Sequence, residues 1–188
     1  AQQAMTAACG SRKNGKYLYH VKTDAALPAN ARSAGDLTRM SVLQRNNVNE
    51  TGKGARAMVF AHGFGCDQNM WRFVAPAFRD DFRTILFDHV GAGRSDLRAY
   101  DPEKYSSLHG YADDIVEIGR ELSLTNTVFV GHSVSAMIGA LASIKAPDLF
   151  ESLIMVGPSP RYIDDGDYHG GFSAPQIDEL LASLDDNH

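Results

Sequence analysis

The stretch Thr127-Val-Phe-Val-Gly131-His132-Ser133-Val134-Ser135-Ala136 decides the fold of this chain. Its apolar start predicts a buried strand, and the Ala-, Met- and Ile-rich residues that follow, up to Lys145, predict a helix. Between them lies G-x-S-x-S, which is the nucleophile-elbow pattern with its last glycine replaced by Ser135. We therefore predict that a sharp strand-to-helix turn presents the Ser133 hydroxyl as a nucleophile. The alternative is a serine in an ordinary turn between a strand and a helix.

Strand-like and helix-like segments alternate around this turn, which predicts an α/β fold with a mostly parallel sheet and flanking helices. Three more apolar runs are each predicted to be a strand buried on both faces: Ala57–Ala61, Thr84–Phe87 and Leu153–Val156. Apolar residues spaced along one helical face from Tyr111 predict a helix that ends near Leu124.

Shorter patterns complete the prediction of elements. Val42-Leu43 is strand-like and a turn is expected over Asn49–Gly54, while Lys16–Val21 alternates like a short strand. An amphipathic helix is expected over Ser173–Leu184, where Ser173 and Gln176 form a capping box.

The tetrapeptide His62-Gly63-Phe64-Gly65 directly follows the predicted strand that ends at Ala61. Glycines on both sides of Phe64 let its backbone N–H turn inward, as a donor to an oxyanion must. We expect this N–H to pair with that of Val134, at the start of the helix after the elbow. The alternative is a glycine-rich turn with an aromatic plug.

A third loop, Asp88 to Asp96, also follows a strand and contains Gly91-Ala92-Gly93. It lacks the third glycine of a dinucleotide-binding loop and an immediate helix, which argues against dinucleotide binding. We expect Asp88 to bind turn amides while the two glycines allow tight bends.

Composition restricts the class of protein. The 188 residues are 44% hydrophobic and carry a net charge of −5 without a basic stripe, which favours a globular protein in water and argues against nucleic acid as a partner. Cys9 and Cys66 make neither a disulfide framework nor a zinc site. No apolar run is long enough to span a membrane and no secretion leader is recognisable. We expect a cytoplasmic protein that needs no metal or cofactor.

Several longer stretches together resemble one family. The stretches are His62-Gly-Phe-Gly-Cys-Asp-Gln68 with Trp71, Phe87 to Asp101, Gly131-His-Ser-Val-Ser-Ala-Met-Ile-Gly139, Pro158-Ser-Pro-Arg-Tyr162 and Asp167-Tyr-His-Gly-Gly-Phe172. From Met40 to His188 the chain resembles the α/β-hydrolases around the bacterial stress-response regulator RsbQ and the plant karrikin and strigolactone receptors. Residues 1–39 stay unassigned.

The resemblance implies a partial α/β-hydrolase fold, with a helical lid that begins near residue 159 over an apolar pocket. It implies a serine hydrolase that forms an acyl-enzyme on Ser133 from a small apolar ester or lactone, with Phe64 and Val134 as oxyanion donors. His132 and Phe64 are then expected to contact the substrate. The alternative is a ligand-sensing regulator with slow or no turnover, which acts on a partner such as a regulatory phosphatase in a stress response.

The catalytic acid and base are missing from the predicted site. A nucleophilic serine needs a histidine base and a carboxylate, which in this fold follow the serine on loops after later strands. His169 lies in the loop before the lid helix and His188 is the last residue, so neither follows a strand of the sheet. We expect the acid and base to lie beyond residue 188 and the chain as given to be truncated and inactive. Asp164, Asp165 and Asp167 share one loop and are interpreted as solvated rather than metal-binding.

Overall fold

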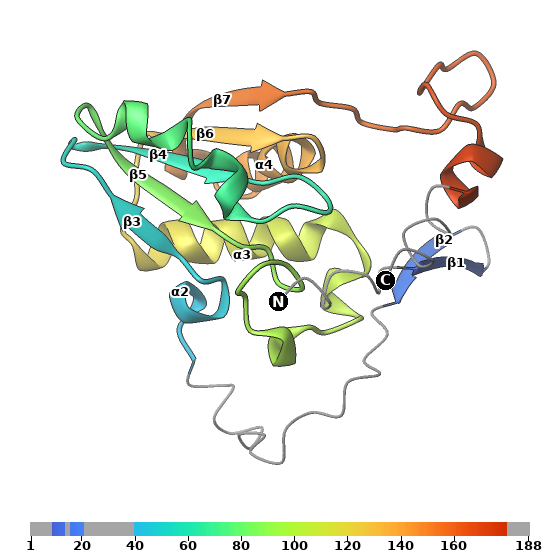
Figure 1. The fold of residues 1–188 in the computed structure, drawn as a ribbon, viewed down its shortest axis with the longest axis horizontal. Helices are drawn as coiled ribbons and strands as arrows, with labels where there is room; N and C mark the ends of the chain where they lie inside the picture. The colour runs from blue at the N-terminus through green and yellow to red at the C-terminus, as the bar shows by residue number, and fades with distance from the viewer. Residues whose placement is uncertain (1–8, 14–15, 21–39, 180–188) are drawn as a thin grey trace.

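The structure is a computed structural model that describes residues 9–13, 16–20 and 40–179. Its main body is a five-stranded sheet in the order β3-β5-β4-β6-β7 (Figure 1). The strands are β3 (Asn49–Thr51), β4 (Arg56–Ala61), β5 (Phe82–Phe87), β6 (Thr127–His132) and β7 (Phe150–Val156). Only β3 pairs antiparallel, with β5, whereas the other described neighbours in this sheet are parallel. The predicted mostly parallel sheet is confirmed.

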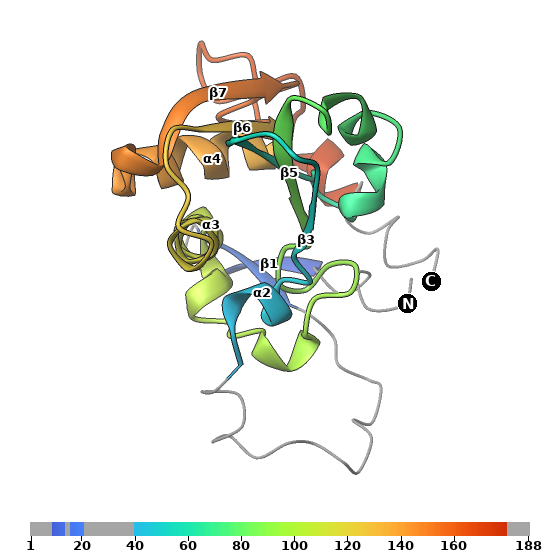
Figure 2. The ribbon, with the colours of Figure 1, turned by 90° about the vertical axis from the view of Figure 1, so that its left-hand side faces the viewer.

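Two long helices cover one face of this sheet, and short 3-10 helices cover the other (Figure 2). The long helices are α3 (Leu108–Glu121) and α4 (Val134–Lys145), and they contact each other. On the other face lie η1 (Gln68–Trp71) and η2 (Ala75–Phe78). The remaining elements are α2 (Val42–Arg45), η3 (Leu97–Ala99), η4 (Lys104–Ser106) and η5 (Pro147–Leu149).

The core follows the alternation of side chains along the central strands. On β4, Val59 and Ala61 join the cluster under α3 and α4, while Met58 and Phe60 pack against Trp71 on the opposite face. Both sets are buried because β4 has a strand on each side and a layer of helices on each face. The continuous apolar run is the pattern expected of such a strand.

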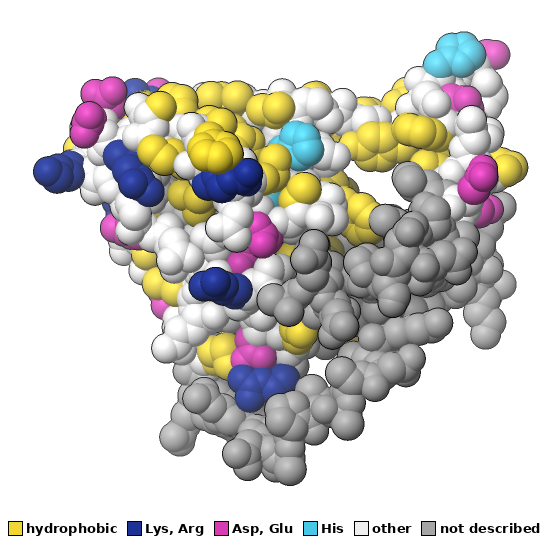
Figure 3. Space-filling view, in the orientation of Figure 1, with side chains coloured by type: hydrophobic (Ala, Val, Ile, Leu, Met, Phe, Trp, Pro, Cys, Tyr) yellow, Lys and Arg dark blue, Asp and Glu magenta, His cyan; other side chains and the backbone are white. Residues whose placement is uncertain are grey.

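Strand β7 differs from the prediction that it is buried on both faces. Ile154, Met155 and Val156 are exposed, and hydrophobic side chains gather along the edge of the molecule where β7 runs (Figure 3). In the described sheet β7 pairs with β6 only, so one of its edges and much of its side-chain surface face outward. The prediction was wrong on burial and right on the strand itself.

Two local predictions near the start of the described region were also wrong. Val42-Leu43 lies in the short helix α2, because Ser41 caps it by accepting a hydrogen bond from the Gln44 N–H at 3.3 Å. Residues Asn49–Thr51 form β3 rather than a turn, and the chain turns only at Gly52, whose φ is +91°.

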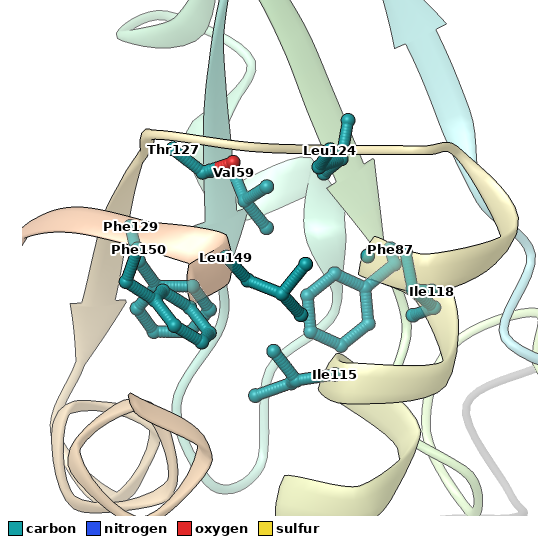
Figure 4. A pocket seen from close by; sticks show the side chains of 10 residues that line it. Val59, Phe87, Ile115, Ile118, Leu124, Thr127, Phe129, Leu149 and Phe150 are labelled. Atoms are coloured by element: carbon teal, nitrogen blue, oxygen red, sulfur yellow. The ribbon is translucent and has the colours of Figure 1, made fainter. Parts of the chain in front are cut away.

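An apolar cavity of ≈ 10 Å³ lies between the sheet and α3 (Figure 4). Its walls include Val59, Phe87, Ile115 and Phe129, with Thr127 as a polar lining residue. Thr127 begins β6 whereas Ser133 follows its last residue, so the cavity lies at the other end of the strand from the elbow. A void of about one water's size is a packing defect of the core and holds no substrate.

The ends of the described chain are simpler. β1 (Cys9–Lys13) and β2 (Lys16–His20) pair antiparallel, so the strand predicted from Lys16 is confirmed. After β7 an irregular loop leads to a helix whose described part is residues 174–179. The Ser173 N–H donates to the Gln176 side chain and the Gln176 N–H to Ser173 Oγ, which confirms the capping box. The end of the predicted helix at Leu184, and His188, lie outside the described residues.

Candidate active site

Ser133 sits in a sharp turn between β6 and α4. Its backbone has φ 54° and ψ −122°, a conformation that a residue with a side chain adopts only under strain. A Cβ atom added to Gly131 would lie 2.5 Å from the carbonyl oxygen of Ser135, so the turn has room only for glycine there. The local structure is therefore the tight, strained turn that the sequence pattern predicts.

Two hydrogen bonds connect Ser133 to the segment around the end of β7. Its backbone N–H donates to the carbonyl oxygen of Val156 at 2.8 Å. Its hydroxyl shares a hydrogen bond of 2.9 Å with the hydroxyl of Tyr162, in the loop that follows β7. A hydroxyl partner can orient the Ser133 Oγ, whereas removing its proton requires a base such as histidine.

The loop after β4 lies directly against this turn. A Cβ atom on Gly63 would lie 3.3 Å from Ser133 Cβ and 2.5 Å from His132 Nδ1, so the absence of a side chain at Gly63 allows the close approach. Phe64 comes next and its side chain is exposed. Within the described residues, neither the Phe64 N–H nor the Val134 N–H donates a hydrogen bond to a protein acceptor. The structure thus brings Gly63 beside Ser133 and leaves both predicted donor amides available.

The side chain of His132 is less accessible than expected for a residue that contacts the substrate. Its ring is partly buried, and Nδ1 faces Gly63 without a hydrogen bond in the part of the chain that the structure describes. The side chain therefore packs the elbow against the loop after β4. Contact of His132 with a substrate stays a prediction.

Sequence reasoning did not find a buried polar cluster next to the elbow. The cluster comprises His62, His89 and Ser135, which are all buried. Ser135 Oγ donates to the His62 carbonyl oxygen at 2.5 Å and lies 2.7 Å from His89 Nε2. The His89 backbone N–H donates to His62 Nε2 at 3.1 Å. A signal was present in the sequence, since each residue closely follows one of three predicted strands.

Both imidazoles of this cluster are held neutral. Burial lowers the pKa of His89 well below its ordinary value of 6.5, and the neighbouring His62 lowers it further. Burial also lowers the pKa of His62, against the hydrogen bond to the Gly63 carbonyl and the charge of Asp88, which act in the other direction. Within the described residues, the hydrogen bonds of both rings go to groups other than Ser133, so neither ring is placed to act as its base.

Asp88 fulfils the structural role predicted for it. Its carboxylate accepts the backbone N–H groups of Gln68 and Arg94, both at 2.9 Å, and the side-chain amide of Asn47 at 2.8 Å. Gly91 and Gly93 have φ of +94° and +53°, which confirms the expected tight bends. Asp88 thereby fastens the loop after β5 to η1.

No described residue supplies the base for Ser133. His169 is exposed in the loop before the last helix, and no histidine nitrogen in residues 40–179 hydrogen-bonds Ser133 Oγ. In the same loop Asp164 accepts the N–H groups of Gly170 and Gly171, while Asp165 pairs with Arg161. Across the described segments, no group of three or more His, Cys, Asp or Glu side chains is arranged to hold a metal ion.

This combination of a parallel sheet, a strained serine turn and an adjoining glycine loop agrees with the family comparison. Residues 56–179 match the family model described as the alpha/beta hydrolase fold. The chain therefore belongs to the α/β-hydrolase fold family.

Individual relatives narrow this assignment. The chain is 44% identical to the karrikin insensitive 2 receptor CA of Petunia hybrida, over 78% of the chain and 54% of that protein. It is 41% identical to the strigolactone esterase D14 of Arabidopsis thaliana, over 81% of the chain and 57% of that protein. A solved hydrolase from Oleispira antarctica has a TM-score of 0.74 and 46% identity, covering 78% of the chain and 54% of that structure.

The resemblance to the karrikin and strigolactone receptors is thus confirmed. The chain spans about half the length of these relatives. None of the described helices has the length and apolar character needed to cross a membrane.

Proposed function

We propose that this protein is a serine hydrolase of small apolar esters or lactones that forms an acyl-enzyme on Ser133. The backbone of Ser133 is the observation that carries the proposal, because its φ of 54° is strained and strain of this kind clusters at functional sites. Similarity to an esterase and to a bacterial hydrolase supports the same chemistry.

The chemical steps follow from the residues around the turn. Ser133 Oγ gives its proton to the base and attacks the carbonyl carbon, the C–O bond to the alcohol oxygen breaks, and that oxygen takes the proton. The alcohol of an ester departs, whereas that of a lactone stays tethered to the acyl group. Water then attacks the acyl-enzyme, releases the acid and returns the proton to Ser133. The N–H groups of Phe64 and Val134 bind the oxyanion of each tetrahedral intermediate, and one such donor is worth about 3 kcal/mol. The phenyl ring of Phe64 and the imidazole of His132 contact the substrate. The reaction also requires a histidine base and a carboxylate, which the described residues do not place at Ser133.

Hydrolysis of p-nitrophenyl acetate by the full-length protein tests the proposal. Ser133→Ala is expected to abolish turnover, while Ser143→Ala, on the same helix α4, serves as the matched control and keeps it. Phe64→Ala retains the backbone N–H, so it is expected to raise KM with little change in kcat. Equal rates for Ser133→Ala and the unchanged protein would remove Ser133 from the mechanism.

For the 188-residue chain alone we expect slow reaction of Ser133 with a fluorophosphonate probe. The described partner of Ser133 Oγ is the hydroxyl of Tyr162, which does not replace a histidine base. Labelling as fast as in an intact serine hydrolase would contradict this expectation.

A second candidate function is ligand sensing with slow or no turnover. The similarity to karrikin insensitive 2 receptor CA favours it, because that protein is named as a receptor. In this case the protein binds a regulatory phosphatase of a stress pathway, and Ser133→Ala keeps that binding. A pull-down with the full-length protein as bait tests it, and absence of any phosphatase from the captured proteins would count against it.

The proposal includes the organisation and location of the chain. Residues 40–188 form part of one hydrolase domain, with the lid beginning near residue 159, and residues 1–39 precede it. We place the protein in the cytoplasm, where Cys66, which forms no disulfide in the described structure, stays reduced. Cell fractionation that found it outside would contradict this placement.

A further inference from the structure

Three polar side chains meet at the carboxyl ends of three adjacent strands. His62 follows β4, His89 follows β5 and Ser135 follows β6, and these strands lie side by side in the order β5-β4-β6. The exposed fractions are 1% for His62, 6% for His89 and 0% for Ser135. The ring centroids of the two histidines are 4.8 Å apart. Polar side chains this deeply buried are usually hydrogen-bonded, so their partners indicate where the protons lie.

The directions of these hydrogen bonds assign the protons. The His89 backbone N–H donates to His62 Nε2, so that nitrogen carries a lone pair and the His62 proton sits on Nδ1. The Nδ1–H then donates to the Gly63 carbonyl oxygen at 2.9 Å. The His62 ring therefore carries one proton and is neutral.

The hydroxyl of Ser135 settles the tautomer of His89. Its single hydrogen goes to the His62 carbonyl oxygen, so its oxygen accepts a hydrogen bond from His89 Nε2–H. His89 Nδ1 is left without a proton, and it is buried without a hydrogen-bond partner among the described residues. Two sets of hydrogen bonds thus meet at His62: Ser135 Oγ holds its backbone carbonyl, and the His89 backbone N–H holds its ring. Together they allow one tautomer for each ring.

The hydrogen bond from the His62 ring ends on the peptide unit of the proposed oxyanion donor, and Ser135 Oγ holds the carbonyl of the peptide just before it. The Gly63 carbonyl and the Phe64 N–H belong to one planar peptide, and no described peptide bond is cis. In a trans peptide the N–H points opposite to the C=O. The hydrogen bond from His62 Nδ1 to the Gly63 carbonyl, together with the one from the Cys66 N–H at 3.3 Å, therefore fixes the direction of the Phe64 N–H.

We propose that Ser135 and His89, acting through His62, are positioning residues that aim the Phe64 amide at the oxyanion. This inference rests on the proposed function, since it requires Phe64 to be an oxyanion donor. It also gives a role to the serine that replaces the last glycine of the elbow pattern: a glycine at position 135 could not hold the His62 carbonyl and the His89 ring together.

The first test is the protonation of the two rings, which does not depend on turnover. In nitrogen-15 NMR of the full-length protein at pH 7, His62 is expected as the Nδ1–H tautomer and His89 as the Nε2–H tautomer, both neutral. In Ser135→Ala, His89 loses its acceptor and its tautomers are expected to mix. A charged ring, or the opposite tautomer at either position in the unchanged protein, would overturn the proposal.

The second test is kinetic and uses p-nitrophenyl acetate. Ser135→Ala is expected to lower kcat about tenfold, part of the effect of losing an oxyanion donor, with KM nearly unchanged. Ser143→Ala on the same helix is the control and should alter neither. An unchanged kcat in Ser135→Ala would refute the positioning role. If Ser133→Ala instead kept full activity, the proposed function would fail while the tautomer result still stood.

Discussion

Ser133 holds a backbone conformation that glycine adopts more readily than any other residue. Its φ of 54° with ψ of −122° places the Cβ atom in a region that costs of order 1–3 kcal/mol for a residue with a side chain. The surrounding hydrogen bonds, from Ser133 N–H to Val156 and from Ala136 N–H to Ser133, keep it there. Stability is therefore given up at the residue that carries the proposed chemistry.

Replacing Ser133 is expected to show this cost directly. Ser133→Gly and Ser133→Ala both remove the hydroxyl and its bond to Tyr162, but only glycine relieves the strain. We expect the glycine variant to be more stable than the alanine variant by about 1 kcal/mol, although neither is active. Urea denaturation of both variants measures the difference, and an alanine variant of equal or greater stability would contradict it.

The buried histidines make stability depend on pH. Because the pKa values of His62 and His89 are lowered by folding, the unfolded chain binds more protons below pH 6.5 than the folded chain. Stability is thus fully present above pH 6.5 and falls as pH drops from there, by up to about 1.4 kcal/mol per pH unit for each histidine. Denaturation between pH 7.5 and 5.5 measures this slope.

A matched pair of variants identifies the source of that slope. His89→Gln is expected to flatten it, whereas His109→Gln, at an exposed histidine of α3, should leave it unchanged. The same slope in both variants would show that other groups control the acid sensitivity.

Some of these residues could be predicted from the sequence and others could not. Ser133 and Asp88 were found because their roles depend on neighbours within a few positions along the chain. The contacts among His62, His89 and Ser135 depend instead on the order of strands in the sheet, which places residues 27 and 46 positions apart next to His89. No local pattern specifies that order.

At the scale of elements, the two ends of β6 have different surroundings. Its carboxyl end carries the elbow, whereas Thr127 at its start borders the small cavity and has a buried hydroxyl without a partner in the described residues. A buried hydroxyl without a hydrogen bond is unfavourable. Each end of β6 thus has one buried polar atom without a hydrogen bond among the described residues: Thr127 Oγ1 at the start and His132 Nδ1 at the carboxyl end.

Thr127→Val is expected to stabilise the protein by about 1 kcal/mol, because it replaces this hydroxyl with a methyl group of similar size. Thr84→Val is the matched control, since Thr84 is equally buried on β5 but its hydroxyl donates to the Thr51 carbonyl oxygen at 3.0 Å. That variant should be destabilised. Thermal unfolding of both distinguishes the cases, and a stability loss in Thr127→Val would mean that its hydroxyl has a partner.

The elements themselves were predicted unevenly, for physical reasons. The helix over Val134–Lys145 was predicted to the residue because the elbow and Pro147 mark its ends. Val42-Leu43 was taken for a strand because two apolar residues fit either structure, and the Ser41 cap decides for a helix. The exposure of β7 could not be read from its apolar run, since burial depends on which strand lies beside it.

At the scale of the whole molecule, strand β7 exposes an apolar sheet edge that favours self-association. Ile154, Met155 and Val156 are 38% to 47% exposed on a strand at the edge of the described sheet. Such an edge readily pairs with another chain. We expect the 188-residue chain to self-associate as its concentration rises, as measured by light scattering during size-exclusion chromatography.

A lysine on β7 should prevent this association. Ile154→Lys is expected to keep the chain monomeric, because a charge on an edge strand opposes pairing. Ile144→Lys removes an isoleucine that is more exposed and lies on helix α4 rather than on a strand, and it should leave association unchanged. An equal effect of both variants would point to general hydrophobicity rather than to the edge.

The hydrogen bond from the Ser133 N–H to the Val156 carbonyl has a mechanical consequence. Val156 is also where the chain leaves the sheet toward the loop that carries Tyr162, so the serine is held from two sides by one continuous segment. A ligand that displaced this loop would therefore also strain the hydrogen bond between the Ser133 N–H and the Val156 carbonyl. The exchange rate of the Ser133 amide hydrogen would report this displacement, because it rises when the hydrogen bond to Val156 breaks.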